Sequence, residues 1–277
     1  YKALHQNQKG YGNVAIGDEA GRYVTSSLNI AIGFSAGRGK TSAPYNSGEG
    51  NISIGNYTNY DVSTGKFNVS IGGRAGYEID TGESNTLIGN NAGYNIKDGV
   101  GTTILGGYAG RYSSGSSNTF IGYATGDGGT TSAPFSSGQY NTALGYQALK
   151  GFTTGNYNVS IGYDSGIALT TGGNNIFMGG YRAGYATTTG NDNVIIGYGA
   201  GVANVSGDEM VLIGTSAGAS LNHSTDADGS VMIGYQAGKD LTAAVGTFIG
   251  YLAGAEADDA VTKAVYTTYV GYEAGRF

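Results

Sequence analysis

Apolar residues along this chain recur in three-residue groups, and each group is followed at once by a glycine. One example is Val69-Ser70-Ile71-Gly72, and a version of this phrase occurs fifteen times at intervals of 16 to 23 residues. Such a period predicts a stack of similar structural units rather than a globular domain, with each unit contacting only its neighbours.

Each group predicts one short β-strand. Its first and third residues are mostly β-branched or aliphatic, and they share one strand face because side chains alternate with period two. We therefore expect these two columns to line the core. A second, looser strand is predicted at Tyr77-Glu78-Ile79, with glycines such as Gly72 and Gly76 in the turns. The predicted fold class is all-β, a parallel β-solenoid (β-roll) of about fifteen short coils.

The middle residue of each group points to the opposite strand face. This column contains no charged residue, and many of its members are small or fully apolar. Strands that are apolar on both faces are usually covered on both faces, and a copy of the same chain is the simplest cover. The pattern thus predicts an oligomer, although an uncharged, exposed column in a single solenoid is the alternative. The predicted interface residues are Leu87, Phe120, Phe177, Ile195, Leu212 and Phe248.

An asparagine stands immediately before most of the groups, as Asn68 and Asn85 do. Stacked amide side chains hydrogen-bond along such an array, so we expect a structural ladder. A ligand-binding role for this column is the alternative.

The array is predicted to span residues 1–277 as a single repeat array, a fragment of a longer fibre, with inserted loops at 38–50 and 126–140. Both loops contain Thr-Ser-Ala-Pro followed by an aromatic residue, Tyr45 in one and Phe135 in the other. Loops inserted into a solenoid project on one side, which is often the binding side. An aromatic ring on such a loop can stack on a sugar, or it can pack over a neighbouring chain.

A tyrosine follows the glycine in many of the later repeats, including Tyr146 and Tyr163. Their shared position predicts a lateral aromatic stripe. The stripe suits contact with a glycan, while mutual packing of the rings is the alternative.

Composition and charge exclude several classes of function. The chain carries a net charge of −6 with 12% charged residues and no cysteine, so nucleic-acid binding and disulfides are not expected. No apolar stretch is long enough to insert into a membrane. The two histidines, His5 and His223, are far apart, and Asp226-Ala227-Asp228-Gly229 is too short for a calcium loop. We predict no catalytic residues, no cofactor and no metal.

Two segments resemble known attachment proteins. The segments Asn141–Leu149 (Asn-Thr-Ala-Leu-Gly-Tyr-Gln-Ala-Leu) and Thr153–Asn156 (Thr-Thr-Gly-Asn) resemble repeats of bacteriophage tail fibres, and Asn13–Gly17 (Asn-Val-Ala-Ile-Gly) resembles the head repeat of trimeric autotransporter adhesins. The resemblance implies homotrimers of parallel β-rolls that attach to a host surface through a glycan or other receptor, outside the cell, on a virion or a bacterial surface. A self-assembling extracellular filament subunit without specific receptor binding is the alternative.

Overall fold

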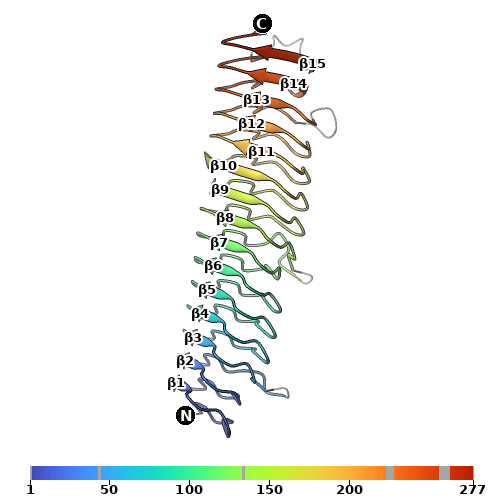
Figure 1. Ribbon diagram of the computed structural model, residues 1–277. Helices are drawn as coiled ribbons and strands as arrows, with labels where there is room; N and C mark the ends of the chain where they lie inside the picture. Colours follow the sequence, from blue (N-terminus) through green and yellow to red (C-terminus); the bar gives the residue numbers. More distant parts are fainter. Residues whose placement is uncertain (1, 43–44, 133–134, 223–227, 256–262, 277) are drawn as a thin grey trace. The chain divides into compact units, whose positions relative to one another are not determined.

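The computed structural model describes residues 2–42, 45–132, 135–222, 228–255 and 263–276. It divides into two compact units, unit 1 (Tyr1–Asn141) and unit 2 (Thr142–Phe277). Each unit is a parallel β-solenoid in which the chain makes one strand, turns back through a series of tight bends, and begins the next strand (Figure 1). No helix occurs in the part of the chain that the structure describes, so the predicted all-β solenoid is confirmed.

Every predicted group forms a strand that pairs in parallel with the strands of adjacent coils in its unit. In this register each residue of a strand lies opposite the residue at the same position of the next repeat, as Val69 lies opposite Thr86 and Ile71 opposite Ile88. Unit 1 contains β1 (Val14–Ile16), β2 (Ile30–Ile32), β3 (Ile52–Ile54), β4 (Val69–Ile71), β5 (Thr86–Ile88), β6 (Thr103–Leu105) and β7 (Thr119–Ile121). Unit 2 contains β8 (Thr142–Leu144), β9 (Val159–Tyr163), β10 (Ile176–Tyr181), β11 (Val194–Ile196), β12 (Val211–Ile213), β13 (Val231–Ile233), β14 (Ala243–Ile249) and β15 (Lys263–Val270).

The orientation of the strand faces is the reverse of the prediction. The middle residue of each strand points into the coil, while the first and third residues point outward and are half-buried or exposed. The interior of each coil is narrow, and the strand contributes one small or large side chain to it. The predicted interface side chains therefore lie in the core of their own chain, each 0% exposed: Leu87, Phe120, Phe177, Ile195, Leu212 and Phe248.

Three side chains from each regular coil build this core. In the coil of β5 they are Leu87 at the strand centre, Ala92 three residues after the glycine, and Ile96 seven residues after it, all 0% exposed. The predicted second strand is wrong, because Tyr77-Glu78-Ile79 forms turns. Left-handed backbone at Arg74 and Gly76, both with φ of +58°, breaks the extended conformation just before it. Ile79 nevertheless points into the core.

The glycine that follows each strand allows adjacent coils to approach closely. Gly72 has φ of +127°, and a Cβ atom there would lie 2.5 Å from the carbonyl oxygen of Gly89 in the next coil. Any other residue at this position would push the two backbones apart.

The glycine four residues further on makes room for the strand centre. A Cβ on Gly126 would lie 2.6 Å from Cγ and Cδ1 of Phe120. Two coils have a large side chain at this glycine position, and both have a small residue at the strand centre. These pairs are Asn59 with Ser53, and Leu149 with Ala143. In these two coils the large side chain has therefore moved from the strand centre to the turn.

The asparagine column forms the predicted ladder. Oδ1 of Asn68 accepts a hydrogen bond from the backbone N–H of Asn85 at 3.0 Å, and Oδ1 of Asn85 accepts one from the N–H of Thr102 at 2.9 Å. Nδ2 of Asn85 donates to the carbonyl oxygen of Gly99 at 2.7 Å. Asn68 and Asn85 are fully buried, so their amides satisfy backbone groups that water cannot reach. The structural role is confirmed.

Candidate functional site

A groove of about 670 Å³ in unit 1 is the best-formed candidate for a binding site. The turns of consecutive coils form it, and the inserted loop 126–140 contributes Phe135 and Ser137. Figure 1 shows the connections after β2 and after β7 on the same side of unit 1. Charged side chains supply most of the lining: Lys40, Asp61, Glu78, Asp80, Lys97 and Asp98.

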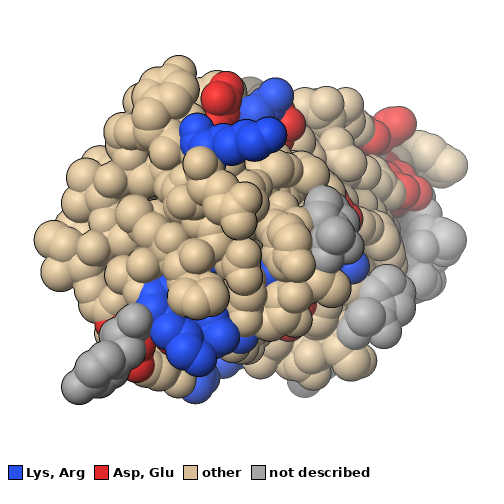
Figure 2. All heavy atoms as spheres, turned by 90° about the horizontal axis from the view of Figure 1, so that it is seen from below, with Lys and Arg blue, Asp and Glu red and all other residues tan. Residues whose placement is uncertain are grey.

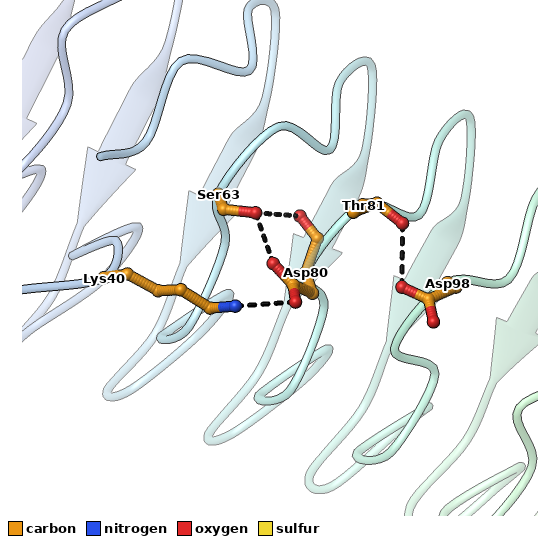
Figure 3. A network of polar contacts seen from close by, with 5 residues as sticks. All are labelled: Lys40, Ser63, Asp80, Thr81 and Asp98. Carbon is orange, nitrogen blue, oxygen red and sulfur yellow. Dashed lines mark hydrogen bonds and ion pairs between the residues drawn. The ribbon is translucent and has the colours of Figure 1, made fainter. Parts of the chain in front are cut away.

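Polar contacts between coils hold several of these side chains in place (Figure 3). Nζ of Lys40 donates to Oδ2 of Asp80 at 2.6 Å, and Oγ of Ser63 donates to the same carboxylate. One coil further along, Oγ1 of Thr81 donates to Oδ1 of Asp98 at 2.7 Å. The Lys40 side chain thus reaches from the turn after β2 to the turn after β4, which fixes one end of the groove.

The pKa values of the neighbouring carboxyl groups of Asp61 and Asp80 are shifted in opposite directions. Burial alone would raise the pKa of Asp80, but hydrogen bonds from Lys40 and Ser63 outweigh it and lower that pKa. Burial, followed by the negative charge of Glu78, raises the pKa of Asp61. The groove therefore contains a carboxylate that is held ionised beside one that is biased toward its neutral form.

The aromatic residues of the two inserted loops pack on their own chain. Tyr45 stacks on Tyr23 with 6.2 Å between ring centroids, and Phe135 stacks on Tyr112 at 6.3 Å. The loops differ in what lies next to the ring. Phe135 lines the large groove, whereas Tyr45 lines a separate cavity of about 240 Å³ with Gln6, Gln8, Lys9 and Thr25.

The predicted tyrosine stripe is present in unit 2. Tyr146 and Tyr163 stack with centroids 5.1 Å apart and ring planes 8° apart, and Tyr181 continues the stack 5.6 Å from Tyr163. Sugars pack against the free face of an aromatic ring, and here each ring covers the face of the next. The stacking therefore favours the packing alternative for Tyr146 and Tyr163, although both remain 42% exposed.

A second tyrosine stack in unit 1 is absent from the sequence predictions. Tyr60, Tyr77 and Tyr94 stack at 5.1 and 4.8 Å, and the guanidinium of Arg38 lies 4.7 Å from the centroid of Tyr60. The signal is present in the sequence, because each of these tyrosines stands five residues after its strand glycine. The groove also escaped prediction, since its ion pair joins Lys40 to a residue two coils away.

The outward strand columns form an apolar face in each unit. In unit 1 they include Ile16, which is 60% exposed, and Leu105, which is 42% exposed. In unit 2 they include Leu144 at 45% and Val270 at 65%. These columns, and not the buried middle column, are the strand side chains that reach the surface.

The described part of the chain contains no group of three or more His, Cys, Asp or Glu side chains arranged to hold a metal ion. His223 and Asp226 lie outside the described residues, and the carboxylate of Asp228 accepts the backbone N–H of Asp208 at 2.9 Å. No described helix is long and apolar enough to cross a membrane. On the face in Figure 2, charged side chains form small groups on a mostly uncharged surface.

Comparison of the chain with protein-family models, with curated proteins and with solved structures gave no match.

Proposed function

We propose that this chain is a structural and adhesive segment of a homotrimeric attachment fibre that contacts a host cell surface. The fibre belongs outside the cell, on a virion tail or on a bacterial surface. The outward apolar face of the strands is the observation that carries the proposal, and the resemblance of Asn141–Leu149 to tail-fibre repeats supports the trimer.

The apolar face needs a partner because soluble monomers rarely expose a continuous apolar patch larger than a few hundred Å². Two outward columns of Val, Ile, Thr and Leu recur in nearly every coil of both units. A second copy of the chain presents the same columns at the same spacing, so its coils match one for one. Full burial of a fully exposed leucine or isoleucine contributes about 1.5–3 kcal/mol, and a side chain such as Leu105, which is 42% exposed before association, gains about two fifths of that.

The molar mass in solution, measured by light scattering, tests this proposal. We expect three times the chain mass of 28.1 kDa. Combining Leu105→Lys with Leu144→Lys places a charge on the outward face of each unit and is expected to shift the protein toward monomer. The matched control combines Val100→Lys with Val205→Lys, at residues outside the fifteen strands that are 46% and 38% exposed, and is expected to leave the trimer intact.

A stable wild-type monomer would refute the trimer, as would equal masses for the two double variants. Circular dichroism of both variants checks that the β structure is retained. Open-ended polymers in place of a discrete species would favour the self-assembling filament.

A further inference from the structure

The groove in unit 1 combines features that suit a ligand with many hydroxyl groups. Its lining includes two ammonium groups, four carboxylates and the hydroxyls of Ser114 and Ser137. Lys40 and Asp80 already neutralise each other at 2.6 Å, and Asp98 accepts a hydrogen bond from Thr81. These contacts fix donors and acceptors side by side. A sugar hydroxyl can both donate and accept, so it can join such a set without bringing a charge.

An aromatic ring borders this polar lining. Phe135 packs against Tyr112 with ring planes 18° apart, which fixes the orientation of its ring, and it also lines the groove. The apolar face of a pyranose packs well on such a ring, while its hydroxyls point toward polar neighbours. Ligand sites combine apolar contact with polar groups that fix the orientation of the ligand, and here one aromatic ring supplies the first and the polar lining supplies the second.

The charges of the groove select among possible ligands. Four carboxylates against two lysines leave the lining net negative, which repels sialic acids, uronates and phosphorylated sugars. A basic peptide would need carboxylates that are free to pair with it. The pairing of Asp80 with Lys40 removes one of these carboxylates.

We propose that this groove binds an uncharged oligosaccharide, with Phe135 packed on a pyranose ring and Glu78, Lys97 and Asp98 hydrogen-bonded to hydroxyl groups. The inference rests on the proposed attachment function and gives it a ligand class. Three chains in a trimer would present the groove three times, so weak single contacts would add to a firm attachment.

The twin loop supplies an internal control. Tyr45 occupies the same place in the first loop as Phe135 does in the second, and it stacks on Tyr23 at a nearly equal distance. It lines a different cavity. Removing either ring costs one similar aromatic contact, but only the Phe135 ring belongs to the groove.

The test applies the full chain to an array of neutral hexopyranose oligosaccharides, sialylated and uronate-containing oligosaccharides, and immobilised oligolysine. The neutral sugar that binds best is then titrated by calorimetry. We expect Phe135→Ala to weaken binding at least tenfold, Phe135→Tyr to retain it, and Tyr45→Ala to leave it unchanged. Glu78→Gln is expected to weaken binding without lowering the melting temperature.

Absence of neutral-sugar binding would overturn the inference, as would stronger binding to sialylated sugars or to oligolysine. Equal losses in Phe135→Ala and Tyr45→Ala would also overturn it. The mass of each protein is measured in parallel. An intact trimer that binds no sugar refutes only the proposal of sugar binding in the groove, whereas a monomer refutes the proposed trimeric fibre.

Discussion

The side chain at the strand centre and the residue at the second-glycine position of a coil occupy adjacent space in the core. This can be tested by moving the large side chain from the first position to the second. Replacing Phe120 with alanine empties a fully buried position, which is expected to cost about 3–5 kcal/mol. Replacing Gly126 with leucine puts an L residue at φ of +54°, a strain of about 1–2 kcal/mol. It also overpacks the core against Phe120, which adds about 1–3 kcal/mol.

The two replacements together reproduce the natural pair Ala143 and Leu149, in which Leu149 has φ of +54°. The leucine then fills the space of the lost ring, so the cavity and the overpacking both disappear. We expect the double variant to retain only the backbone strain of about 1–2 kcal/mol. Independent effects would instead add to about 5–10 kcal/mol.

Hydrogen exchange measured by mass spectrometry is the suitable assay, because a repeat array opens locally, coil by coil. Each 1.4 kcal/mol changes the exchange rate of protected amides about tenfold. Peptides covering β7 should exchange roughly a hundredfold or more faster in Phe120→Ala and about tenfold faster in the double variant. Peptides covering β4 serve as the control and should be unchanged. If the exchange rate of the double variant corresponds to the sum of the two single free-energy losses, the idea that the two side chains fill the same space is refuted.

Two further predictions concern the polar interior and the groove. Asn85→Ala leaves the N–H of Thr102 and the carbonyl of Gly99 unpaired. The free energy of unfolding, measured in urea, should fall by about 2–6 kcal/mol. A loss no larger than that caused by Asn85→Thr would contradict this. The lowered pKa of Asp80 means that its ionised form stabilises the fold. The stability difference between wild type and Asp80→Asn should be full above the unfolded-state pKa of about 3.9 and disappear as the pH falls through the lower folded-state pKa. A stability difference that persists at pH 2 would show that the contacts of Lys40 and Ser63 with Asp80 do not stabilise the fold through the charge of its carboxylate.

The positions of the strands, their parallel order and the asparagine ladder were all predictable from the sequence, because each follows from a fixed column of the repeat. The face that points inward was not. Alternation separates two columns, but both were free of charge, so hydropathy alone did not choose between them. The burial of Leu87 and Phe120 decides it, and the small Ala143 beside the large Leu149 is a sequence pair that fits a middle column in the interior.

The groove illustrates another limit of sequence reasoning. The repeat phrase describes contacts between equal positions of adjacent coils, whereas Lys40 reaches an aspartate 40 residues away, past the coil between them. Its reach depends on side-chain length and on which turns lie on the same side. A proline and an aromatic residue mark the loop with Phe135 in the sequence. Which residues lie beside that ring in the groove depends on the three-dimensional arrangement of the turns.

The residue-for-residue register has a consequence for how a gene of this kind changes length. Ile30 pairs with Ile52 although the connection between them is longer than most, so the extra residues left the register intact. A codon added inside a strand phrase would instead move an outward isoleucine into the narrow interior and displace the glycine from its contact with the next coil. The register shifts in the pairs β9/β10 and β14/β15 lie beside the three-residue phrase and not within it, so we expect changes of length to occur as whole repeats or outside the phrase.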